Sequence, residues 1–154
     1  MTRLALVIAT AFGCGFFPFG PGTAGSLFAL AVAALLHHFW GIGPLGILIV
    51  AAVALAPAIW SATVTERHVG REDPGLVVVD EVLGQWIALA GAAVWNWKTF
   101  LAAFVLFRLF DIWKPQPVRW AESLPAGTGI IADDLVAGLY GALILYVGGL
   151  LRIF

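Results

Sequence analysis

Two pairs of adjacent acids open two strongly apolar stretches of this sequence. Asp80 and Glu81 directly follow the apolar residues 76–79, and Asp133 and Asp134 directly follow residues 130–132. One carboxylate at a helix start can act as a cap that accepts hydrogen bonds from free N–H groups. Two adjacent acids at each of two helices cost desolvation and mutual repulsion unless a cation lies between them, and ionisable groups at membrane depth are candidates for function. We therefore favour a metal site over double capping.

Three charged residues recur at intervals of three along another apolar stretch, at Arg108, Asp111 and Lys114. On a helix with 3.6 residues per turn, they lie within about a third of its circumference. Arginine presents a forked donor that matches phosphate, and lysine presents a point positive charge. We expect Arg108 and Lys114 to bind phosphate, with Asp111 between them as a ligand or an orienting acid. The alternative is a ladder of ion pairs that only neutralises itself.

A loop rich in glycine and proline precedes the first long apolar stretch, with the sequence Pro-Phe-Gly-Pro-Gly-Thr-Ala-Gly-Ser over residues 18–26. Glycine lets the backbone approach a ligand closely, and a helix N-terminus attracts anions. We expect Gly22, Thr23 and Ser26 to contribute to phosphate binding. Taken alone, the loop fits a re-entrant turn with an ordinary Thr cap equally well, because it lacks the lysine of a P-loop.

The composition of the whole chain indicates a membrane protein. Its 154 residues are 62% hydrophobic and 11% charged, with a net charge of −1 and one cysteine. So few charges cannot solvate a soluble globule, and they provide no basic excess for binding nucleic acid. One cysteine excludes a disulfide framework and a thiolate zinc site. We expect an all-α, polytopic integral membrane bundle that forms a single membrane-embedded domain over residues 1–154, since helices satisfy their own backbone in lipid.

Clusters of glycine and proline divide this apolar sequence into elements. No Asp, Glu, Lys or Arg lies between Arg3 and Glu66, a stretch too long for one span. We expect about four to five transmembrane helices and a short N-terminal apolar helix. The predicted ranges are 3–12 for the short helix and 24–40, 44–66, 80–96, 98–113 and 132–151 for the spans, of which 98–113 is the weakest because of its charges.

Small residues are spaced so that two of these helices can approach each other closely. Gly84 and Gly91 belong to the span predicted over 80–96, and Gly138 and Gly141 belong to the span over 132–151. Such spacing lets helix backbones come into contact in membranes. The contact would bring the two acidic pairs together at one end of the bundle.

Tracing the spans alternately across the bilayer collects most charged residues on one side. Segments 13–23, 66–81 and 108–133 share that side, and the turns at 41–43 and near 97 share the other. Basic residues are enriched on the cytoplasmic side of membrane proteins, which indicates that the charged side is cytoplasmic. The basic residues divide into Arg67, Arg71, Arg108, Lys114 and Arg119 on this side and Lys98 and Arg152 on the other.

The residue types on the charged side favour metal-assisted phosphate chemistry. Carboxylates without a cluster of Cys or His favour a hard cation such as Mg²⁺. At a bilayer surface, the natural phosphate ligand is a lipid headgroup, and a metal can assist its hydrolysis by polarising the phosphoryl oxygens and activating water. A cysteine phosphatase needs an arginine six residues after its nucleophile, where Cys14 has Gly20. An aspartyl-phosphate formed on one of the acids stays open.

Four sequence blocks follow one another along the chain: Gly-Cys-Gly at 13–15 with Pro-Gly-Thr-Ala-Gly-Ser at 21–26, Asp-Glu-Val-Leu-Gly at 80–84, Phe-Arg-Leu-Phe-Asp-Ile-Trp-Lys-Pro-Gln-Pro at 107–117, and Gly-Thr-Gly-Ile-Ile-Ala-Asp-Asp-Leu-Val-Ala-Gly at 127–138. Taken together and in this order, they resemble those of the phosphatidylglycerophosphatase A family of bacterial inner-membrane lipid phosphatases. The resemblance implies Mg²⁺-dependent removal of the terminal phosphate of phosphatidylglycerophosphate at the cytoplasmic face, giving phosphatidylglycerol and inorganic phosphate. The family's acidic and basic motif positions fall on Asp80, Glu81, Arg108, Asp111, Lys114, Asp133 and Asp134.

We assign roles within this site as a hypothesis. Glu81, Asp111 and Asp134 are expected to bind Mg²⁺, and Asp80 or Asp133 to act as general base on the attacking water. Substrate binding is assigned to Gly22, Thr23, Ser26, Arg108 and Lys114. The partner is a phospholipid in the bilayer.

Two other classes of protein compete with this interpretation. A transporter that relays protons or cations predicts acids spread over the depth of the bilayer. A non-catalytic scaffold, in which the acids only cap and pair, would bind no divalent metal.

Overall fold

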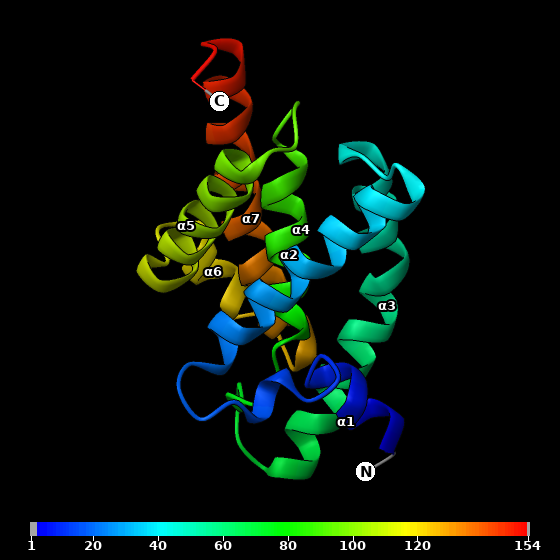
Figure 1. Ribbon diagram of the computed structural model, residues 1–154. Coiled ribbons are helices and arrows are strands. Elements are labelled where there is room, and N and C mark those ends of the chain that lie inside the picture. The colour runs from blue at the N-terminus through cyan, green and yellow to red at the C-terminus, as the bar shows by residue number, and fades with distance from the viewer. Residues whose placement is uncertain (1–2, 154) are drawn as a thin grey trace.

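The computed structural model describes residues 3–153, and this part of the chain is helical with no strand, as the composition predicts. Helices α2, α3, α4, α5 and α7 pack into one bundle, with the short helix α1 at its lower end and the short helix α6 beside α5 and α7 (Figure 1). The elements are α1 (Arg3–Ala9), the 3₁₀ turn η1 (Cys14–Phe16), α2 (Pro21–Trp40), α3 (Pro44–Val69), α4 (Val79–Ala90), α5 (Trp97–Trp113), α6 (Val118–Glu122) and α7 (Gly127–Leu150).

Proline and glycine set the bounds of α2 and α3. Each helix begins with a proline, Pro21 or Pro44, where the missing N–H has no helical partner to lose. Each ends at a glycine in the left-handed region, Gly41 with φ 64° and Gly70 with φ 70°. The first span therefore starts three residues earlier than the predicted residue 24.

The bounds of α4 and α7 differ more from the predicted ranges. Helix α4 ends at Ala90 and not at residue 96. Asn96 instead caps the start of α5 by accepting hydrogen bonds from the backbone N–H groups of Lys98 and Thr99. Helix α7 begins at Gly127, so Asp133 and Asp134 lie beyond its first turn. These two acids therefore cannot be the N-terminal caps of that helix.

Three helices, α2, α3 and α7, are long and apolar enough to cross a membrane. Helix α4 has 12 residues and α5 has 17, so both are shorter than the roughly 20 residues that a full crossing takes. The structure therefore confirms a helical membrane protein but not the predicted count of four to five spans.

Helix α4 lies at the centre of the bundle, where α2, α3, α5 and α7 surround it (Figure 1). Its crossing with α7 is backbone to backbone. A Cβ on Gly84 would lie 2.6 Å from the carbonyl oxygen of Asp134, and one on Gly138 would overlap the carbonyl of Gly84. This is the close approach that the small residues predict, and it fixes the start of α4 beside the acids of α7.

The segments that carry most charges meet at one end of the bundle. The start of α2, the end of α3 and the starts of α4 and α7 lie together at the end shown lowest in Figure 1, near α1. The α2–α3 turn and the end of α7 lie at the opposite end, where the ring of His37 is 5.2 Å from that of Trp95 in the α4–α5 connection.

Candidate functional site

A cavity of about 230 Å³ opens at the start of α4. It gathers residues from the start of α2, the loop before α4, and helices α4, α5 and α7. All seven acidic and basic residues that carry the motifs line it. The full lining is Gly20, Pro21, Gly22, Asp73, Gly75, Val77, Asp80, Glu81, Arg108, Asp111, Lys114, Ile130, Asp133 and Asp134.

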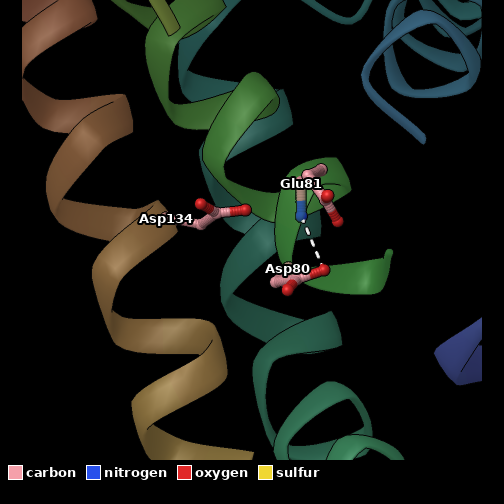
Figure 2. A group of neighbouring side chains, drawn as sticks. All are labelled: Asp80, Glu81 and Asp134. Carbon is pink, nitrogen blue, oxygen red and sulfur yellow. Dashed lines mark hydrogen bonds between the residues drawn. The ribbon is translucent and has the colours of Figure 1, made fainter. Parts of the chain in front are cut away.

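Three carboxylates form the tightest group in this cavity. Asp80 and Glu81 of α4 and Asp134 of α7 each offer an oxygen, and these oxygens lie within 4.8 Å of one another (Figure 2). Asp80 and Asp134 are buried. One oxygen of Asp80 accepts a hydrogen bond from the backbone N–H of Glu81 at 3.0 Å. Glu81 Oε2 and Asp134 Oδ2 are buried without a hydrogen-bond partner among the described residues.

This donor set fits a hard divalent cation. Buried carboxylates at this separation repel one another strongly unless a positive charge lies between them. The two unpartnered oxygens come from different helices, so a cation between them would satisfy both and join α4 to α7. Oxygen donors of this kind suit Mg²⁺ or Ca²⁺, and no thiolate takes part.

Asp111 lines the cavity but is paired with a base. Its Oδ2 lies 2.6 Å from Nη1 of Arg108, which is also 3.9 Å from Oε1 of Glu81. The three-residue spacing on α5 therefore produces one ion pair within the helix, between Arg108 and Asp111. The sequence-based assignment names Glu81, Asp111 and Asp134 as metal ligands. The tight group in the structure contains Asp80 in place of Asp111, which is paired with Arg108.

Lys114 joins two helices at the rim of the cavity. It ends α5 in the left-handed region with φ 47°, and its Nζ donates hydrogen bonds to Asp133 Oδ2 and Glu122 Oε1, both at 2.8 Å. Burial by itself would lower the pKa of the ammonium, but these hydrogen bonds raise the pKa above its ordinary value. Lys114 therefore stays charged at neutral pH and remains available to an anion.

Asp73 is a cavity residue to which the sequence analysis assigns no role. It lies in the loop between α3 and α4. Burial raises the pKa of its carboxyl group above the ordinary value, against the opposing effect of the Lys114 ammonium. In the sequence, Gly70 and Gly75 mark the loop that contains Asp73 and leads to the acidic pair of α4. This loop is the feature that could have pointed to Asp73.

The glycine loop reaches the cavity with its backbone. A Cβ on Gly22 would overlap Oε1 of Glu81 and lie 3.0 Å from Nη1 of Arg108, so any other residue there would displace these two side chains. Thr23 and Ser26 do not line the cavity. Since α2 begins at Pro21, Ser26 falls in its second turn, where it is buried and donates a hydrogen bond to the Gly22 carbonyl at 3.0 Å.

Comparisons with known proteins identify the family of the chain. The family model for phosphatidylglycerophosphatase A matches residues 7–148. Phosphatidylglycerophosphatase A of Escherichia coli is 36% identical over 145 residues, covering 93% of this chain and 82% of the relative. The Haemophilus influenzae protein of the same name is 36% identical over 141 residues, covering 91% and 85%.

A further relative has a name with a different substrate. A Bacteroides thetaiotaomicron protein, named provisionally as a phosphatidylinositol-3-phosphatase, is 40% identical over 154 residues, covering 94% of this chain and 92% of the relative. No solved structure matches the chain. The family model spans nearly the whole chain and contains every charged residue of the cavity, so the chain belongs to the phosphatidylglycerophosphatase A family.

Proposed function

We propose that this protein removes the terminal phosphate of phosphatidylglycerophosphate in the bacterial inner membrane, with its cavity facing the cytoplasm. One observation carries the proposal: six carboxylates, three of them in one tight group, line a single cavity with an arginine and a lysine at one end of a membrane bundle. Family membership supplies the substrate class, and the enrichment of basic residues at this end supports the orientation. A phosphomonoester on a lipid headgroup needs this combination of cation site and anion-binding bases.

Asp80, Glu81 and Asp134 would hold the divalent cation, for which Mg²⁺ is our proposal. Two of these residues carry the unpartnered oxygens, and the third completes the group. A bound divalent cation supplies charge that polarises the phosphoryl oxygens and offsets the repulsion among the carboxylates.

Arg108 and Lys114 would bind the phosphate. Arg108 and Lys114 lie six residues apart at the end of α5. Arg108 forms an ion pair with Asp111, and Lys114 forms one with Asp133. Their positive charge matches the two negative charges of a phosphomonoester, and the arginine can donate two parallel hydrogen bonds to it. Glycine at position 22 lets the start of α2 lie close to the side chains of Glu81 and Arg108.

Asp133 is the better placed of the two acids considered as general base. Asp80 lies inside the three-acid group, whereas Asp133 lines the cavity outside it, 2.8 Å from Lys114. In the reaction, Asp133 accepts a proton from the water that attacks phosphorus. The bond between phosphorus and the glycerol oxygen breaks, its electrons stay on that oxygen, and a solvent proton neutralises the leaving group.

A substrate panel tests the activity. Purified protein in mixed micelles is assayed for phosphate release from phosphatidylglycerophosphate, phosphatidic acid and phosphatidylinositol 3-phosphate, with Mg²⁺ and with a chelator. We expect release from phosphatidylglycerophosphate to be fastest and to stop with the chelator. Faster release from the inositol lipid would give the substrate named for the Bacteroides relative, and release from none would reject the proposal.

The variant Asp134→Asn tests the cation site. It removes one of the unpartnered carboxylates, so we expect phosphate release to fall by at least about a hundredfold. We also expect Mg²⁺ to raise the unfolding temperature of the parent protein and not that of the variant, since a cation that binds the folded state stabilises it. Glu72→Gln is the matched control, because Glu72 is exposed at the same end outside this cavity. Full Mg²⁺-dependent activity of Asp134→Asn contradicts the assignment.

A further inference from the structure

The segment of residues 12–19 exposes four phenylalanines at the end of the molecule that carries the cavity. The exposed fractions are 77% for Phe12, 61% for Phe16, 53% for Phe17 and 83% for Phe19. Large apolar side chains gathered on one segment mark a surface that meets an apolar partner. None of the four belongs to a membrane-crossing helix, so the apolar helices of the bundle do not explain their exposure.

This segment lies between two cavities of opposite character. Phe19 directly precedes Gly20, Pro21 and Gly22, which line the charged cavity. At the other end of the segment, Phe12 lines an apolar groove of about 470 Å³ between α1, α2, α3 and α4. The segment therefore forms the rim that separates the charged cavity from an apolar surface.

The core holds the segment in place. The backbone N–H of Val78 donates a hydrogen bond to the Ala9 carbonyl at 2.8 Å, and a Cβ on Gly15 would overlap the carbonyl of Leu76. The segment therefore packs against the residues that lead into α4. Its four phenylalanine side chains nevertheless stay more than half exposed.

The charges around the segment identify what covers it. The segment itself contains no charged residue. Exposed charged residues lie near it, with Arg67 in the last turn of α3, Arg71 and Glu72 in the α3–α4 loop, and Arg119 in α6. These charges mark the level of the headgroups and water, and an apolar segment at that level meets the boundary between headgroups and acyl chains.

We infer that residues 12–19 insert their phenylalanines into the leaflet that supplies the lipid substrate and form the rim over which its headgroup enters the cavity. The inference rests on the proposed function for the identity of that lipid. Insertion sets Gly20, Pro21 and Gly22 at the depth of the lipid phosphates. The acyl chains of the substrate then stay in the leaflet, on the Phe12 side of the rim, while the phosphate reaches the carboxylates.

Spin labels measure the insertion without any assay of activity. Phe17→Cys and Phe19→Cys are made in a Cys14→Ala background, labelled, and reconstituted in vesicles of phosphatidylethanolamine and phosphatidylglycerol. Glu72→Cys, in an exposed loop at the same end, is the control. We expect labels at 17 and 19 to collide with oxygen more than with a water-soluble nickel chelate, and the label at 72 to show the reverse. Collision with the chelate at all three positions overturns the inference, and so does protection from both reagents at 17 and 19, which indicates a protein cover.

Activity assays measure the role in substrate entry. The double variant Phe17→Ser/Phe19→Ser is compared with Phe39→Ser, since Phe39 is an exposed phenylalanine at the opposite end. We expect the double variant to lose about tenfold in kcat/KM on long-chain substrate in vesicles and to keep its activity on a water-soluble short-chain analogue. An equal loss on both substrates, or no loss on vesicles, overturns the role in entry. The label depths stay informative even if phosphatidylglycerophosphate proves to be the wrong substrate.

Discussion

At the scale of single residues, Gly22 determines how Glu81 and Arg108 can be placed. An added Cβ would overlap the carboxylate of Glu81, which is the far end of a flexible side chain, and would crowd the guanidinium of Arg108. Both side chains can move aside, so the fold can tolerate the change. Catalysis does not tolerate the change, because small displacements of reacting groups cost large factors in rate.

Gly22→Ala is therefore expected to lower kcat by up to about a hundredfold while leaving the unfolding temperature nearly unchanged. Gly149→Ala is the matched control, because Gly149 also lies in a helix and has no atom within 4 Å of the added Cβ. It should keep full activity and stabilise α7 by about 0.5–1 kcal/mol. Phosphate release and thermal unfolding in detergent measure the two effects. Equal activity of both variants would show that Gly22 does not shape the site.

The sequence predicts which residues line the site better than it predicts their partners. All seven charged motif residues line one cavity, because their spacing and their places at the ends of apolar stretches are encoded locally. The sequence-based assignment places Asp111 with Glu81 and Asp134, whereas the structure groups Asp80 with them. Asp111 forms an ion pair with Arg108 of its own helix, and the residue spacing does not reveal which partner it takes. Ser26 lies outside the cavity because α2 begins at Pro21.

At the scale of elements, the crossing of α4 and α7 assembles the site. Gly84 and Gly138 let the two backbones touch, and this contact places Asp134 beside Asp80 and Glu81. Any side chain at the crossing separates the helices, and the separation moves the third carboxylate away from the other two. Stability and activity are therefore coupled at this position.

Gly138→Leu is expected to destabilise the protein by about 1–3 kcal/mol or more, since it forces a large side chain into a packed contact. Phosphate release should fall in the fraction that remains folded, because the acids no longer meet. Thermal unfolding in detergent and the specific activity of the monodisperse fraction measure both effects. Gly149→Leu, on the same helix in open space, should change neither. Normal activity of Gly138→Leu would mean that the crossing does not position the acids.

Helix bounds are the part of the elements that the sequence predicts least well. Gly41 and Gly70 end α2 and α3 within a few residues of the predicted positions, because glycine at a helix end is a local signal. The start of α7 at Gly127 depends on contacts with another helix. The backbone N–H of Gly127 donates a hydrogen bond to the hydroxyl of Thr63 in α3, and no local pattern reveals that partner.

At the scale of the whole molecule, the α4–α5 pair reaches the far end of the bundle although both helices are short. The ring of Trp95, in the α4–α5 connection, contacts the ring of His37, so this connection lies at the level of the last turn of α2. Helix α4, with 12 residues, rises only about 18 Å. Length and composition identify the three long spans, but the path of this pair depends on the tilt of α2 and on packing, which sequence-based counting of spans does not include.

Thiol labelling tests this arrangement and the proposed orientation. In a Cys14→Ala background, Val94→Cys lies in the exposed α4–α5 connection and Glu72→Cys in the α3–α4 loop. We expect a membrane-impermeant maleimide to label position 94 in intact cells with a permeabilised outer membrane and position 72 only after lysis. Labelling of both positions from the same side would contradict the crossing, and the opposite pattern would reverse the orientation.

The central crossing also has a consequence for biosynthesis. The nascent chain inserts Asp80 and Glu81 long before the ribosome delivers Asp134, and the glycine contact that fixes α4 forms only with α7. Until α7 is synthesised, Asp80 and Glu81 lack Asp134 beside them, and α4 lacks its backbone contact with α7. We therefore expect chains truncated before α7 to hold this acidic pair without its helix partner and to be less stable than the full chain.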